Sequence, residues 1–74
     1  MSRLPAISGK EAIRAFERDG WVVARRESTH VTMKKNRVRF LLTVPLHREL
    51  DRGLLRRLVR DSGLTVEEFG RLLG

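Results

Sequence analysis

The sequence contains no cysteine, which excludes two ways of stabilising a small protein. Neither a disulfide framework nor a cysteine-ligated zinc site can supplement the core. The chain has 74 residues, and a chain of this size buries only roughly 60% of the surface that its unfolded form exposes. We therefore expect one small domain, residues 1–74, held together by ordinary packing.

Long apolar runs are also missing. No stretch approaches the ~20 apolar residues that a membrane-spanning helix needs. The first residues, Met1–Pro5, lack the apolar segment of a signal peptide. We expect no membrane association and a cytoplasmic location.

Motifs that bind cofactors are absent as well. The six glycines are scattered and do not form a phosphate-binding loop. The two histidines, His30 and His47, lack the close His or Cys partner that a zinc site requires. Glu11, Glu67 and Glu68 stand where helix caps are expected and form no catalytic pair. We expect neither a metal nor a cofactor.

Positive charge is abundant: 16 Lys and Arg stand against nine Asp and Glu, for a formal net charge of +7. Such a balance favours a polyanionic partner, nucleic acid above all, and predicts binding that weakens with salt. An acidic protein partner fits the charge equally well. A surface of merely solvated basic residues is the third alternative.

Capping boxes predict where the first and last helices begin. Ser8 and Glu11 can bond each other's backbone amides, and Gly20 suits the left-handed position after the helix. Thr65 and Glu68 repeat the box ahead of a short terminal helix.

A longer helix is expected between Asp51, as its cap, and Gly63. Arg52, Arg56 and Arg60 recur on one side of it. This ridge could follow an RNA backbone, meet an acidic protein, or simply face solvent. The apolar stripe of the helix consists of Leu54, Leu55, Leu58 and Val59.

Three strands are expected between these helices, over residues 21–26, 30–34 and 38–44. Short turns join them into an antiparallel meander, with Asn36 suited to the positive φ of a tight hairpin. Pairing should fade at Pro45, which cannot donate to a ladder. The side chains expected to share one face of the third strand are Val38, Phe40, Leu42 and Val44.

The element order is therefore αβββα with a short C-terminal helix. A three-stranded sheet has one face to cover, and two amphipathic helices can cover it. We predict an α+β fold, a two-layer αβββα sandwich.

The middle strand places a histidine on the open face of this sheet. Side chains alternate along a strand, so burying Val31 and Met33 turns His30, Thr32 and Lys34 outward.

His30 is the strongest candidate for chemistry. An imidazole can take the proton of a ribose 2′-hydroxyl or protonate the leaving oxygen. Nearby cations, Arg25, Arg26, Lys34 and Lys35, can stabilise the charge that develops on the phosphate. Such internal attack needs no metal. The alternative is an exposed strand histidine without a task.

His47 is a secondary candidate, because it follows Pro45 shortly before the long helix. It could contact phosphate or serve as a second acid–base group. A role in packing the connector is the alternative.

The order and spacing of several short motifs resemble the HicA toxin family (YcfA-like) of bacterial and archaeal toxin–antitoxin modules. The resemblance extends over nearly the whole chain. The residues that carry it are Ser8-Gly9-Lys10-Glu11, Gly20-Trp21, Arg26-x-x-Thr29-His30, Thr43-Val44-Pro45-x-His47, Gly53-Leu54-Leu55-Arg56-x-Leu58 and Glu67-Glu68-Phe69.

The resemblance implies a relative of the double-stranded-RNA-binding domain and an endoribonuclease that cleaves mRNA without a metal. It implies an essential histidine, His30 here, and a cognate HicB-like antitoxin that covers it. The family's Gly-Ser-His motif reads Ser28-Thr29-His30 in this chain. Thr29 keeps the hydroxyl, whereas Ser28 removes the backbone freedom of a glycine.

Three functions stay open on the sequence alone. The first is a toxin ribonuclease in which His30 is the general acid or base and Arg25, Arg26, Thr29, Lys34 and Lys35 bind phosphate. The second is a non-catalytic RNA-binding module that uses the same basic surface. The third is an interaction protein that docks an acidic partner.

Overall fold

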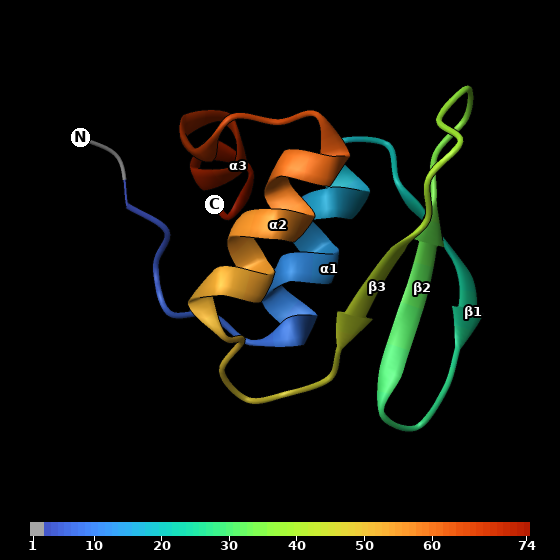
Figure 1. Ribbon diagram of the computed structural model, residues 1–74, viewed down its shortest axis with the longest axis horizontal. Helices are drawn as coiled ribbons and strands as arrows, with labels where there is room; N and C mark the ends of the chain where they lie inside the picture. The colour runs from blue at the N-terminus through green and yellow to red at the C-terminus, as the bar shows by residue number, and fades with distance from the viewer. Residues whose placement is uncertain (1–2) are drawn as a thin grey trace.

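The computed structural model describes residues 3–74 and contains three helices and three strands. Their order confirms the predicted αβββα arrangement with a short terminal helix, an α+β layout consistent with the double-stranded-RNA-binding domain (Figure 1). The elements are α1 (Gly9–Arg18), β1 (Val22–Arg26), β2 (His30–Lys34), β3 (Leu42–Pro45), α2 (Arg52–Ser62) and α3 (Val66–Leu72).

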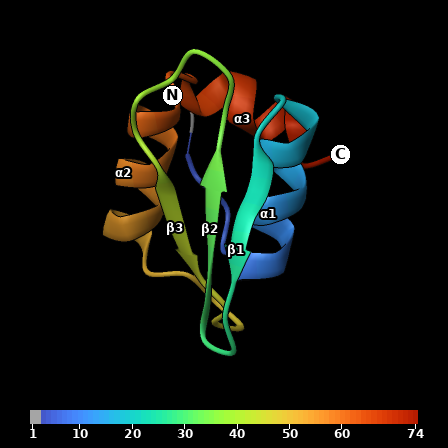
Figure 2. The ribbon, with the colours of Figure 1, turned by 90° about the vertical axis from the view of Figure 1, so that its right-hand side faces the viewer.

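The strands form one antiparallel sheet in the order β1-β2-β3, with β2 in the centre. All helices lie on one side of this sheet (Figure 1). When the sheet faces the viewer, the helices stand behind it and none of the described residues 3–74 forms a layer over the near face (Figure 2). The predicted two-layer sandwich is confirmed.

The core lies between the sheet and the helices. Val31 and Met33 of β2 are completely buried there. The ring of Phe16 from α1 lies 5.1 Å, centroid to centroid, from that of Phe69 in α3 and 6.5 Å from that of Trp21. Apolar residues from every layer therefore meet in one cluster.

Both predicted capping boxes are present. Ser8 and Glu11 bond each other's backbone amides at the start of α1, and Thr65 and Glu68 do so at α3. The backbone N–H and hydroxyl of Thr65 hold the pKa of the Glu68 carboxyl below its ordinary value. Asp51 caps α2 by accepting the N–H of Leu54 at 3.1 Å.

The third strand is shorter than predicted. It begins at Leu42 and includes Pro45 as its last residue. Leu42 and Val44 are buried as expected, but the expectation that Phe40 shares their face is wrong, because its side chain is 68% exposed. The chain leaves the ladder after Lys34, so alternation does not extend back to Phe40.

The connection between β2 and β3 also differs from the predicted tight turn. It spans residues 35–41, and Asn36 does not carry the positive φ. Arg37 does, with a φ of 69°. In a longer connection the left-handed position need not fall on the residue that a short hairpin turn would use.

One glycine has no room for a side chain. A Cβ built on Gly9 would lie 1.9 Å from the carbonyl oxygen of Pro45. The N–H of Gly9 donates to the carbonyl of His47 at 2.9 Å. The first turn of α1 therefore rests directly on the backbone between β3 and α2, which a side chain at residue 9 would push away.

We predict that Gly9→Ala lowers the free energy of unfolding by about 1–3 kcal/mol, because the methyl group overpacks a backbone contact. Chemical denaturation measures this change. Gly70→Ala in α3 is the matched control, since its Cβ meets nothing within 4 Å. The control should be neutral or stabilising by up to about 1 kcal/mol. Equal effects at both positions would contradict the close contact.

We predict a pH-dependent contribution from Glu68. Its pKa is lowered in the folded state, so its ionised form stabilises the fold above the ordinary value of 4.5. That stabilisation is lost as the pH falls through the lowered pKa. Thermal unfolding of Glu68→Gln should therefore differ from the parent at neutral pH and converge with it in acid. A difference that persists in acid would contradict this.

Candidate functional site

His30 begins β2, directly after the turn that joins it to β1. Its Nε2 lies 2.6 Å from Oε1 of Glu27, and its Nδ1 lies 3.1 Å from the hydroxyl of Thr29. The side chains of His30 and Glu27 are 38% and 41% exposed. The ring is thus held at both nitrogens while it stays open to solvent.

These two contacts give the ring nitrogens different roles. An ionised carboxylate only accepts hydrogen bonds, so Glu27 places a proton on Nε2. In the neutral ring this leaves a lone pair on Nδ1, which the Thr29 hydroxyl can donate to. A substrate can replace that neutral, exposed hydroxyl more easily than it can replace the carboxylate. Nδ1 is therefore the nitrogen that is suited to accept a proton.

The backbone fixes the turn from two sides. The N–H of Glu27 donates to the carbonyl of His30 at 2.9 Å, and the N–H of Leu46 donates to the carbonyl of Thr29 at 2.8 Å. Ser28 has no positive φ; within residues 3–74, Arg37 is the one non-glycine residue that has. The turn accepts a serine at this position without strain.

The uncovered face of the sheet carries three cross-strand rows, which its register defines. His30 pairs with Pro45, Thr32 pairs with Thr43, and Val22 pairs with Lys34. Because paired residues share a face, all six look away from the helices. The prediction that His30 lies on the open face is confirmed.

A bulge in β1 decides which arginine joins this face. The register shifts between Val23 and Arg25, so Arg25 pairs with Thr32 and Arg26 with the buried Val31. Without the extra residue the two arginines would exchange faces. Arg25 therefore shares the face of His30, whereas Arg26 turns toward α1. There it lines a small hollow with Lys10, Ile13, Arg14 and Glu17.

The two lysines after His30 also separate. Lys34 lies on the open face, opposite Val22. Lys35 points the other way, and its Nζ lies 3.1 Å from Oδ2 of Asp19 at the end of α1. Its charge is thus already paired. Of the four cations predicted around His30, the fold places Arg25 and Lys34 on its face.

The remaining candidates lie elsewhere. His47 is exposed and lies in the connection after β3. Its carbonyl accepts a hydrogen bond from the N–H of Gly9. Arg52, Arg56 and Arg60 are exposed along α2. No role for these residues follows from their position alone.

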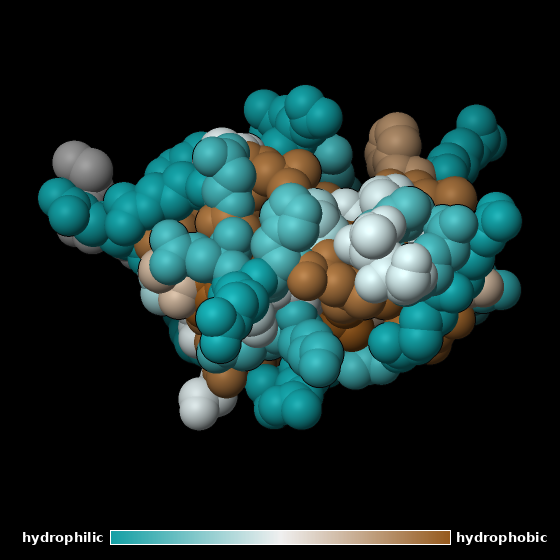
Figure 3. Space-filling model, turned by 90° about the horizontal axis from the view of Figure 1, so that it is seen from below, coloured by the Kyte–Doolittle hydropathy of each residue, from teal (hydrophilic) through white to brown (hydrophobic). Residues whose placement is uncertain are grey.

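The end of the molecule that carries the β1–β2 turn is largely hydrophilic. Seen from below, teal side chains cover most of it, with smaller brown areas between them (Figure 3). In residues 3–74, no three His, Asp or Glu side chains gather as metal ligands would. No helix in this part of the chain is long and apolar enough to cross a bilayer.

Two features of the site escaped the sequence argument. One is Glu27, although its place three residues before His30 across a tight turn is a usable signal. The bulge at Ala24 has no such signal, since alternation alone assigns Arg26 to the outer face. The roles of Arg25, Arg26, Thr29, Lys34, Lys35 and His47 stay predictions.

Comparison with known proteins agrees with the motifs. The model of one family, described as the HicA toxin of bacterial toxin–antitoxin, matches residues 9–64. No curated protein matches the chain. The matched segment contains α1, the whole sheet and α2, and so includes the His30 turn. The chain belongs to the HicA toxin family, and as a member of a toxin–antitoxin system it has a cognate antitoxin as its partner.

Proposed function

We propose that this toxin is an endoribonuclease that cleaves mRNA in the cytoplasm, with His30 as its general acid or base and without a metal. The observation that carries the proposal is the arrangement of His30 itself. The ring stands on the uncovered face of the sheet, with Nε2 held by Glu27 and Nδ1 in contact with an exposed hydroxyl. A carboxylate that sets the tautomer leaves the other ring nitrogen able to accept a proton, as acid–base chemistry requires.

The chemistry follows from Nδ1. It takes the proton of a ribose 2′-hydroxyl, and the 2′-oxygen attacks the adjacent phosphorus. The new bond joins the 2′-oxygen to phosphorus, and the bond from phosphorus to the 5′-oxygen breaks. The leaving oxygen takes a proton from solvent or from the protonated ring. No reactant beyond RNA and water enters this sequence.

Cations on the same face stabilise the charge that develops on the phosphate oxygens. Arg25 stands in the row next to His30, and Lys34 stands one row further along β2. We assign phosphate binding mainly to these two side chains and to the hydroxyl of Thr29. Arg26 and Lys35 face the helices, so they add to the positive field at longer range. We assign His47 no part in this step.

The uncovered face also suggests how the activity is controlled. An HicB-like antitoxin that covers His30 would exclude RNA from the site. A basic sheet face of this kind fits an acidic partner, because opposite potentials favour association.

A non-catalytic RNA-binding module is the second candidate, since the same basic face supports it. It differs in one respect: it needs neither His30 nor Glu27.

We predict that His30→Ala lowers the rate of RNA cleavage at least about 100-fold, since it removes the proton acceptor. The assay follows a labelled single-stranded RNA in the presence of a chelator. Affinity for RNA should change little, because Arg25 and Lys34 remain.

The control for this variant is His47→Ala, which removes an exposed imidazole in the neighbouring connection. It should retain most of the activity. Equal cleavage by the His30→Ala variant and the parent would refute the catalytic role. If neither the parent nor the His30→Ala variant cleaves RNA but both still bind it, the non-catalytic binding module is favoured.

We predict that Glu27→Ala lowers kcat about tenfold and does not raise KM. The carboxylate positions the ring but does not bind RNA, and its exposure makes the loss smaller than for a buried catalytic carboxylate. Steady-state kinetics on the same RNA measure both constants. Glu27→Gln, which can still accept from Nε2, should recover part of kcat. A rise in KM with kcat unchanged would show that Glu27 serves binding instead.

A further inference from the structure

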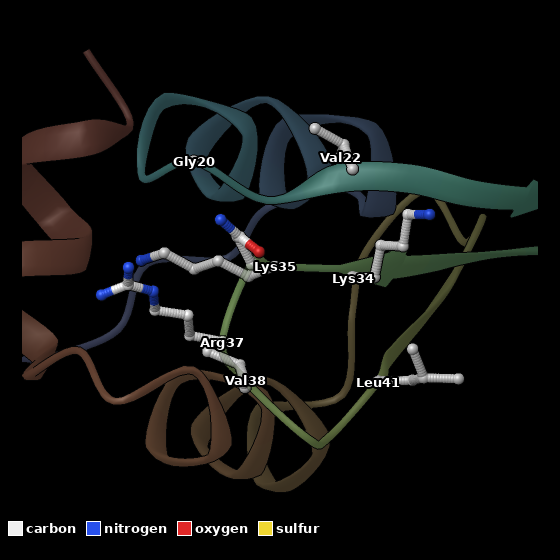
Figure 4. Close-up of a pocket in the computed structure, with 8 residues that line it drawn as sticks. Gly20, Val22, Lys34, Lys35, Arg37, Val38 and Leu41 are labelled. Carbon is white, nitrogen blue, oxygen red and sulfur yellow. The ribbon is translucent and has the colours of Figure 1, made fainter.

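A second feature of the uncovered face lies at its far end from His30. There an open hollow of about 490 Å³ lies between the start of β1, the end of β2 and the β2–β3 connection (Figure 4). The residues that line it are Gly20, Val22, Lys34, Lys35, Asn36, Arg37, Val38 and Leu41.

The lining of the hollow combines apolar and cationic groups. Val22 and Leu41 are 51% and 61% exposed, and they are two of only three large hydrophobic residues exposed within residues 3–74. Lys34 and Arg37 supply positive charge, and no acidic side chain lines the hollow. Lys35 also lines the hollow, but its charge is paired with that of Asp19. An anion with an apolar, flat part would satisfy both kinds of group.

The hollow and His30 are parts of one surface. Lys34 lies four residues after His30 on β2, which is roughly 13 Å along a strand. The row between them consists of Arg25, Thr32 and Thr43, all on the same face. These side chains offer hydroxyls and a guanidinium, the groups that commonly contact a nucleic-acid backbone. An RNA strand that crosses this row reaches both His30 and the hollow.

We propose that the hollow binds an unpaired nucleobase of the RNA whose scissile phosphate lies at His30. The base packs on Val22 and Leu41, and Lys34 and Arg37 hold the adjoining phosphates. The Asn36 amide can bond a base edge. A base must be unstacked and unpaired to enter such a site, so the substrate is single-stranded at this position, a few nucleotides from the cut. This inference rests on RNA being the substrate, as proposed above.

RNA fits the hollow better than an acidic protein does. Here the neighbouring row is polar and basic, which matches the alternation of base and phosphate along one strand. The positively charged side chains of Arg25 and Lys34 also lie between His30 and the hollow on the same face.

The test measures RNA binding by protein that carries His30→Ala, so that the probe stays intact. The probe is a fluorescent single-stranded RNA of about twelve nucleotides, within the length that one binding domain covers. A dinucleotide and an abasic strand of the same length serve as comparison probes. The variants are Leu41→Ser and Lys34→Gln, both at exposed positions. Arg57→Gln on α2 is the control for loss of charge, and Leu41→Met is the control for loss of apolar surface.

We expect Leu41→Ser to weaken binding of the longer RNA about tenfold, because it removes apolar surface on which the base packs. Leu41→Met keeps that surface and should bind like the parent. Binding of the dinucleotide and of the abasic strand should not change. Lys34→Gln should weaken binding of the longer RNA and of the abasic strand alike, and more than Arg57→Gln does.

Unchanged affinity of Leu41→Ser for the longer RNA would overturn the inference and leave the hollow to a protein partner. The inference would also be overturned if the protein that carries His30→Ala alone bound no RNA. Cleavage by protein with His30 intact is measured separately. If cleavage fails but Leu41→Ser still loses affinity, the ribonuclease proposal falls and the base-binding hollow stands.

Discussion

The alternation of the central strand is the constraint on which the arrangement depends. β2 is paired on both sides, and its inner residues Val31 and Met33 are completely buried between two neighbouring strands and the helices. A register slip by one residue would expose both and drive His30 into the core. Burial of Val31 and Met33 therefore also holds His30, the catalytic candidate, on the open face. The same packing that forms the core places the site.

Two local features of the backbone complete the site: the turn before β2 and the bulge in β1. The turn before β2 is fixed by backbone bonds, and this brings the Glu27 carboxylate to Nε2 of His30. The bulge in β1 turns Arg25 onto the same face. On the other side of the sheet, Gly9 lets α1 approach the Pro45 backbone, which holds β3 and its partner His30 in place. The scaffold supports a shallow, basic, solvent-facing site, and such a site suits a long polyanion better than an enclosed small molecule.

Much of the fold could be predicted because its signals are local. Capping residues such as Ser8 and Thr65 determine helix starts through bonds within four residues, and alternation over Val31 and Met33 determines the facing of β2. Predictions were wrong where the chain leaves regular structure. Phe40 follows the strand pattern in the sequence, but the ladder ends before it reaches that residue. The bulge at Ala24 and the Lys35–Asp19 pair depend on tertiary contacts, so the division of the basic residues between the two faces could not be read from their spacing.

The central claim is that His30 catalyses attack by a ribose 2′-hydroxyl. The most direct measurement uses a single-stranded RNA in which the one ribose at the mapped cleavage position is replaced by 2′-deoxyribose. The account predicts that the unmodified strand yields a 2′,3′-cyclic phosphate and a 5′-hydroxyl, and that the modified strand resists cleavage at that position. Cleavage of the modified strand at the same bond, or products with a 5′-phosphate, would contradict it.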